Sequence, residues 1–202
     1  MKTRNFSFAA IAAIVLGVGT TTFAAGKNGS SAKDKEVSTV LTNVSKINKI
    51  EVRGNVEVFI SDAEKDQITV YNHYYSESAL IQDQNGVLRI SSFAPEKLVV
   101  WVKASQLSGI SAYDSAQIES FGKISSLEMD VVLYDHAYAK LDIDGYSVNF
   151  NIYNHAKADL AGSLTECCLD YYRSATVNST NLIAAHLTRK IEKAQGEQLV
   201  DL

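Results

Sequence analysis

The sequence is poor in the residues that usually interrupt or cross-link a chain. It has one proline, Pro95, and two cysteines, Cys167 and Cys168, which are adjacent. Neighbouring residues of a strand point to opposite faces, so a disulfide between them would strain the backbone. We therefore expect one buried and one exposed thiol, and the alternative is an intermolecular disulfide through Cys168 in an oxidising compartment. In either case, no disulfide framework holds this fold together.

Long apolar runs and basic tracts are absent after the first 25 residues. Lys2 and Arg4 precede an apolar segment at 6–18, and small residues at 22–24 supply a cleavage site, so residues 1–25 are predicted to be a signal peptide. An uncleaved anchor is the alternative, but the segment is shorter than the ~20 residues of a membrane span. Removing the two cations leaves 17 of the 19 Lys and Arg residues against 23 Asp and Glu, a net charge of −6. The sequence therefore predicts an exported protein (periplasmic, cell-surface or extracellular) that neither binds nucleic acid nor spans a membrane after cleavage.

The rest of the chain is predicted to be a leader and one domain. Residues 26–43 are rich in Lys, Ser and Gly, which is typical of a flexible polar leader. Apolar and polar residues then alternate, which predicts strands at 44–52, 56–60, 68–71, 86–91 and 97–103. A segment at 184–194 is ambiguous between helix and strand. One domain, residues 44–202, is enough for this length.

Four related tetrapeptides recur in the second half of the chain with a period of about 19–21 residues, which is typical of stacked repeats. They are Tyr113-Asp114-Ser115-Ala116, Tyr134-Asp135-His136-Ala137, Tyr153-Asn154-His155-Ala156 and Tyr172-Arg173-Ser174-Ala175. Before and after each tetrapeptide, apolar residues occupy alternate positions in step with the repeat. Each repeat is therefore predicted to be a strand, a tight corner at the Ala, and a second strand.

Equivalent positions at a fixed period predict parallel strands stacked in register, about 4.8 Å apart. The expected fold is all-β, a single-domain right-handed parallel β-helix whose regular coils run from about residue 105 to 187. An antiparallel sandwich is the alternative, but it has less reason to keep Tyr and Ala in step through four repeats. In a fifth repeat the inward positions would be His186, Thr188 and Lys190. We therefore expect the coil to stop at 183–187 and the following segment to form a polar cap.

The repeated corners supply the candidate site residues. Tyr113, Tyr134, Tyr153 and Tyr172 are predicted to form a ladder on the outside of the corners. We favour a structural role for this ladder, because cross-strand aromatic pairs stabilise sheets, over a platform for sugar rings or a partner protein.

His136 and His155 share a column, as do Asp114 and Asp135. The histidine pair raises a metal hypothesis and the carboxylates raise a calcium or hydrolase hypothesis. The ligand count is too low for a metal, so we favour solvated corner residues and expect no catalytic site, cofactor or metal.

The chain also resembles a known family, the "putative auto-transporter adhesin, head GIN domain" proteins of bacterial envelopes. The resemblance rests on Ile47–Ile60, Asn85–Ile90, Val99–Lys103, Leu107–Ile110 and the serial corners. It covers residues 44–194 and implies a β-helical exported domain with an adhesin-like label and no established chemistry. The corners differ from the family's usual Ser-Gly-Ala/Ser-like sequences.

These observations lead to three hypotheses on function. The first is a non-enzymatic envelope or cell-surface protein with an adhesin-like binding or structural role, whose partner is a polysaccharide or an envelope protein. The second is a carbohydrate-active β-helix, either a polysaccharide lyase or a hydrolase. The third is self-assembly into a homo-oligomer through the coil ends, because stacked coils expose unpaired strand edges there.

Overall fold

The computed structural model describes residues 38–41, 44–71 and 79–192 of the chain. The predicted signal peptide, residues 1–25, lies outside the described residues, and so do positions 26–37 of the predicted leader and the last part of the predicted cap, 193–202. Positions 38–41 of the predicted leader form a strand, so the prediction of an unstructured segment is wrong there.

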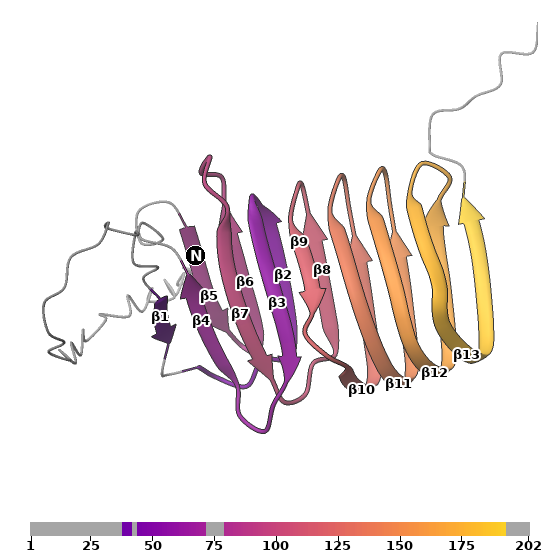
Figure 1. The fold of residues 1–202 in the computed structure, drawn as a ribbon, viewed down its shortest axis with the longest axis horizontal. Coiled ribbons are helices and arrows are strands. Elements are labelled where there is room, and N and C mark those ends of the chain that lie inside the picture. Colours follow the sequence, from indigo (N-terminus) through magenta and orange to yellow (C-terminus); the bar gives the residue numbers. More distant parts are fainter. Residues whose placement is uncertain (1–37, 42–43, 72–78, 193–202) are drawn as a thin grey trace, which may run out of the picture. The chain divides into compact units, whose positions relative to one another are not determined.

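Strands are the only regular secondary structure in the described ranges, and they belong to one 13-stranded sheet (Figure 1). They are β1 (Ser38–Leu41), β2 (Lys49–Gly54), β3 (Val56–Asp62), β4 (Gln67–Tyr71), β5 (Ala79–Gln84), β6 (Val87–Ser92), β7 (Leu98–Ala104), β8 (Gly109–Tyr113), β9 (Gln117–Ser120), β10 (Ile124–Leu133), β11 (Tyr138–Ile152), β12 (Lys157–Tyr172) and β13 (Thr176–Glu192). The chain is therefore all-β, and the five strands predicted from alternation are all present.

Alternating burial forms one apolar core inside the coils. In β7, for example, Leu98, Val100 and Val102 are buried, whereas Trp101 and Lys103 point outward. The same alternation in β2, β3, β11 and β12 lines the interior with apolar side chains. Because burial of apolar surface is the main favourable term in folding, this shared column pattern determines how the coils stack.

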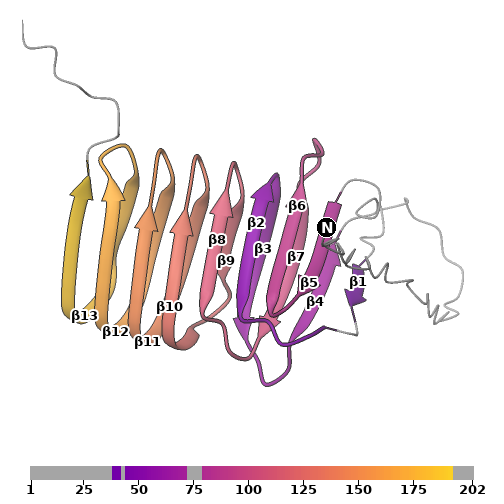
Figure 2. The same ribbon diagram turned by 180° about the vertical axis from the view of Figure 1, so that it is seen from behind.

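The repeats stack in parallel and in register, as the sequence predicts. Ile110, Val131, Phe150 and Leu169, which stand at the same position in successive repeats, are direct neighbours across β8, β10, β11 and β12. All four are buried. Figures 1 and 2 show these coils side by side from front and back.

The N-terminal part of the sheet differs from the prediction, because β1, β4 and β5 pair antiparallel with their neighbours. A short connection from β3 to β4 reverses the direction of the chain, and a parallel crossover needs a longer one. The sheet is thus mixed, and an entirely parallel β-helix is not confirmed.

The order of coils in space also differs from their order in the chain. The coil formed by β2 and β3 lies between the β6–β7 coil and the β8–β9 coil. Arg53 therefore pairs with Tyr113, and the turn at Gly54 lies in the same column as the turn at Asp114. In space, the first repeat corner thus lies next to a corner from the N-terminal half of the chain, where the tetrapeptide does not recur.

At the C-terminal end, the prediction that the coil stops at 183–187 is wrong. Strand β13 pairs with β12 as far as Glu192, and positions 184–192 are strand. A shift in register at Asp159/Ala161 inserts one residue into β13. A shift of one residue exchanges the two faces of a strand, so Leu187, Arg189 and Ile191 continue the inward columns in place of His186, Thr188 and Lys190.

Candidate functional site

The second position of the first three repeat corners has a special backbone conformation, which the turn at Gly54 shares. Gly54, Asp114, Asp135 and Asn154 have φ values of 80°, 62°, 60° and 56°, in the left-handed region. Among residues with a side chain, Asn and Asp are the ones that most readily adopt it. Backbone conformation thus explains the stacked carboxylates of Asp114 and Asp135, and the structure gives no support to the calcium or hydrolase hypothesis.

Hydrogen bonds between corners reinforce this column. The Asp135 carboxylate accepts a hydrogen bond from Asn154 Nδ2 at 3.0 Å and a longer one from Asp114 N at 3.4 Å. The amides of His136 and His155 donate to the carbonyls of Asp114 and Asp135, each at 2.9 Å. These contacts connect one coil to the next.

The tyrosines of the four corners form the predicted column. The ring centroids of Tyr113 and Tyr134 are 5.2 Å apart and those of Tyr134 and Tyr153 are 4.7 Å apart, both stacked, while Tyr172 meets Tyr153 edge-on at 5.2 Å. The guanidinium of Arg53 lies 3.9 Å from the centre of the Tyr113 ring and extends the column. All four rings are half-buried. Burial raises the pKa of Tyr153, as does its neighbour Tyr134.

His136 and His155 stack beside this column, with centroids 5.5 Å apart and planes 9° from parallel. Both are exposed. In the part of the chain that the structure describes, no group of three or more His, Cys, Asp or Glu residues is arranged to hold a metal ion. The two rings make an exposed aromatic contact between two coils.

Sequence reasoning missed a second aromatic cluster, which consists of Phe59, Trp101 and Phe121 and which we call the Trp101 cluster. The Trp101 ring stacks on Phe59 at 5.0 Å and meets Phe121 at 5.2 Å with the planes tilted by 58°. Phe121 is 65% exposed. The signal was available, because Phe59 and Trp101 occupy polar-face positions of two predicted strands, where large apolar residues are unexpected.

Polar side chains surround the Trp101 cluster on the outer face of the sheet. In the row across the strands, Thr69 of β4 pairs with Trp101, and Glu119 of β9 pairs with Phe59. Two residues further along the strands, Gln67, Lys103 and Ser61 form the next outward row. The cluster is thus an apolar centre with hydroxyl, amide, carboxylate and ammonium groups around it.

Other polar groups near these surfaces have structural partners. The hydroxyl of Tyr138 donates to Asp159 Oδ2 at 2.7 Å, and this hydrogen bond, together with burial, raises the pKa of Tyr138 to about 12. Lys140 forms an ion pair with Glu119 at 2.5 Å, which holds that carboxylate at the edge of the Trp101 cluster.

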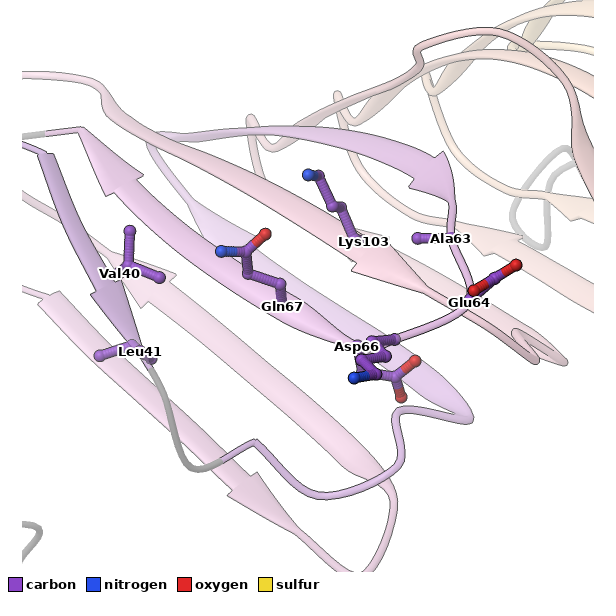
Figure 3. A pocket seen from close by; sticks show the side chains of 8 residues that line it. Val40, Leu41, Ala63, Glu64, Asp66, Gln67 and Lys103 are labelled. Carbon is purple, nitrogen blue, oxygen red and sulfur yellow. The ribbon is translucent and has the colours of Figure 1, made fainter.

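A pocket near the N-terminal end of the sheet contains Glu64, Asp66 and Lys103 among its lining residues (Figure 3). The two carboxylate oxygens of Asp66 accept hydrogen bonds from the amides of Ile47 at 2.5 Å and Ser105 at 2.7 Å. Asp66 thus links two loops through both of its carboxylate oxygens. Because these oxygens are already hydrogen-bonded, Asp66 does not provide a free acid–base pair in the pocket.

The adjacent cysteines are placed as predicted. Cys167 is buried and Cys168 is exposed, and both are free thiols. Burial raises the pKa of Cys167 to about 11, so its thiol is protonated and unreactive at neutral pH.

The fold defines the class of protein, an all-β coil with a mixed sheet, and crystal structures with this fold are known. A "putative adhesin" from Bacteroides fragilis NCTC 9343 is 13% identical, with a TM-score of 0.71 over 80% of this chain and 78% of the other. A "putative lipid binding protein" from Parabacteroides distasonis ATCC 8503 is 11% identical, with a TM-score of 0.64 over 78% and 79%. A "putative adhesin" from Parabacteroides merdae ATCC 43184 is 13% identical, with a TM-score of 0.57 over 78% of each chain. At these identities the likeness concerns the fold alone.

The sequence itself matches a family model over residues 46–196. The chain belongs to the family described as "putative auto-transporter adhesin, head GIN domain". No curated protein matches it at a significant level of similarity. Among the described residues, no helix is long and apolar enough to cross a membrane.

Proposed function

We propose that this protein is an exported, non-enzymatic envelope or cell-surface protein that binds a polysaccharide through the Trp101 cluster. The observation that carries the proposal is the exposure of Phe121 beside the stacked rings of Phe59 and Trp101 on a sheet face. Exposed aromatic patches with polar surroundings mark contact sites. The adhesin description of the family supports a binding role in the same way.

A sugar ring suits this surface because it is amphipathic in the same manner. Its C–H face stacks on an aromatic ring, while its hydroxyl groups lie around the edge. On the protein, Thr69, Gln67 and Lys103 supply a hydroxyl, an amide and an ammonium group beside the rings. A linear polysaccharide can therefore contact apolar and polar groups at once, whereas a purely apolar ligand would leave those polar groups without partners.

The tyrosine column has the structural role in this proposal. Its rings are half-buried. Tyr113, Tyr134 and Tyr153 stack on one another, Tyr172 meets Tyr153 edge-on, and Arg53 closes the Tyr113 end. Faces that are already stacked are not available to a sugar, so the column connects coils through aromatic contacts. We assign the His136–His155 contact to the same role.

We also propose that the parallel strands form a right-handed β-helix, with the antiparallel strands at its N-terminal end. The in-register pairing of β8 to β13 supports this proposal, and right-handed crossovers are the strong default for parallel strands. Export through a signal peptide at 1–25, followed by a leader that ends before β1 and by one domain that starts at β1, completes the proposal. The charged n-region and apolar segment of the sequence support it.

A polysaccharide panel tests the binding role against the enzymatic alternative. The purified protein is incubated with neutral and acidic polysaccharides, and both retention and the release of reducing ends are measured. We expect retention by at least one polysaccharide without release of reducing ends. Trp101→Ala should lower the affinity at least about tenfold, as is usual for a central aromatic contact, and Tyr146→Ser, on another exposed part of the sheet, should not. Release of reducing ends would favour a lyase or hydrolase. If both variants bind the polysaccharide as tightly as the parent does, the contact lies elsewhere on the protein.

A further inference from the structure

The pocket shown in Figure 3, which we call the Lys103 pocket, adjoins the Trp101 cluster. Trp101 and Lys103 both point outward from β7, and they are two residues, or about 7 Å, apart along the strand. Gln67 of β4 pairs with Lys103, and both residues line the pocket (Figure 3). Val40 of β1, which also lines it, pairs with Thr69, the neighbour of Trp101. The aromatic surface therefore leads directly into the pocket.

The pocket is large enough for one unit of a sugar chain. Its volume is about 600 Å³, within the range of about 300–1,000 Å³ that is usual for small-ligand sites. Val40, which is 45% exposed, supplies an apolar surface, and Gln67 supplies an amide beside it. The pocket thus continues the mixture of apolar and polar groups that surrounds the rings.

Lys103 brings to this surface a positive charge that no acidic neighbour holds. The two other lysines nearest the cluster each have a carboxylate partner: Lys97 is 3.8 Å from Glu57, and Lys140 is 2.5 Å from Glu119. Lys103 is exposed, and among the described residues no carboxylate forms an ion pair with it. Its ammonium group is therefore available to an anion from solution.

The acidic residues of the pocket lie further from the rings than Lys103 does. Asp66 accepts a hydrogen bond of 2.7 Å from the amide of Ser105, two residues beyond Lys103 on the side away from Trp101. Glu64 is in the turn before β4, next to Lys65, which also lines the pocket. A ligand that extends from the rings into the pocket therefore meets an ammonium group before it meets a carboxylate.

From this arrangement we infer that the polysaccharide is acidic. One sugar lies on the Trp101 cluster, and a neighbouring sugar places an anionic group on the ammonium of Lys103 in the pocket. This inference rests on the proposed polysaccharide binding. An ammonium group acts as a point charge, so a carboxylate and a sulfate share the chemistry that it recognises. The chain as a whole has a net charge of −4, so its attraction for a polyanion has to come from a local site such as this one.

Matched polysaccharides test the inference. Polygalacturonate is compared with its methyl ester, and chondroitin sulfate is compared with its desulfated and its carboxyl-reduced forms. We expect the protein to retain at least one acidic polymer and to bind it more weakly once the carboxylates or the sulfates are removed, which also identifies the anionic group. Equal retention of charged and neutral forms, with Trp101→Ala still weakening both, would overturn this inference and leave the proposed function intact. Retention of no polysaccharide would overturn both.

Two lysine variants test the position of the charge. Lys103→Gln should weaken binding of the retained acidic polymer about fivefold at low salt, and the difference should vanish at about 1 M salt, where charges are screened within about 3 Å. Lys103→Arg keeps the charge and should bind as the parent does. Lys97→Gln is the control, because it removes a charge from the same outer face that Glu57 already pairs with. An unchanged affinity in Lys103→Gln, or equal losses in Lys103→Gln and Lys97→Gln, would show that the pocket does not select the anionic group.

Discussion

Replacing Ala137 with Leu tests whether the corners are as tight as the stacking requires. Ala137 has no exposed surface, and its amide donates to the Tyr134 carbonyl at 3.0 Å, which closes the corner. The equivalent residues of the neighbouring coils, Ala116 and Ala156, are also fully buried and lie one coil away on either side. A larger side chain at this position has no free direction in which to extend.

The expected cost follows from this geometry. Inserting a larger side chain into a packed core costs about 1–3 kcal/mol of unfolding free energy. For a domain of this size, each kcal/mol lowers the melting temperature by roughly 2–4 °C, so Ala137→Leu should melt about 2–12 °C lower. Thermal unfolding followed by circular dichroism measures the shift.

Ala175→Leu is the internal control. Ala175 occupies the same column in the last corner but is only half-buried, so the same substitution should cost less than about 1 kcal/mol. Equal melting temperatures for the parent and Ala137→Leu would refute the assignment of the Ala column to a packed corner. Equal losses at Ala137 and Ala175 would show that the cost does not come from burial between coils.

Three further predictions concern the corner and the outer face. Changing Tyr134 and Tyr153 together to Ser removes three ring contacts and should lower stability by about 2–4 kcal/mol without loss of polysaccharide binding, measured by chemical denaturation and a binding assay; lost binding with unchanged stability would assign the column to the ligand. At Asn154, with φ of 56°, substitution by Val should destabilise the protein by about 1–2 kcal/mol while Gly is tolerated, and the reverse order would contradict the strain argument. Because the pKa of Tyr138 is raised to about 12, its contribution to stability is complete below pH 10 and is lost as the pH rises toward 12, so Tyr138→Phe should flatten the fall in melting temperature over that window. An unchanged alkaline slope in that variant would show that the Asp159 hydrogen bond has no role in it.

The sequence predicted the regular part of the fold because its information is local and repeated. Alternation identifies strands, and the recurrence of Tyr and Ala aligns one coil with the next, so the neighbours of Phe150 in the adjacent coils were foreseeable. The tyrosine column followed from the same alignment. Its role did not follow, because stacking geometry and exposure are properties of the assembled coils.

Two features of the fold could not be predicted from the sequence, for physical reasons. The insertion of the β2–β3 coil between β6–β7 and β8–β9 depends on long-range pairing, such as that of Arg53 with Tyr113, and no short period reveals it. The extra residue in β13 reverses which side chains face the interior for the rest of the strand. A repeat counted at a fixed 19 residues does not detect such an insertion. The Trp101 cluster was within reach, since Phe59 and Trp101 break the polar face of two predicted strands.

Fluorescence of the single tryptophan tests the central claim most directly. Trp101 is the only tryptophan of the chain, and it lies inside the proposed polysaccharide site, so its emission reports on that site alone. Titration with a polysaccharide that the protein retains should shift or quench this emission in a saturable way, and Phe121→Ala should weaken the apparent affinity at least about tenfold while Tyr134→Ser does not. Emission that stays constant while the protein demonstrably binds the polysaccharide would contradict the assignment of the Trp101 cluster as the binding face.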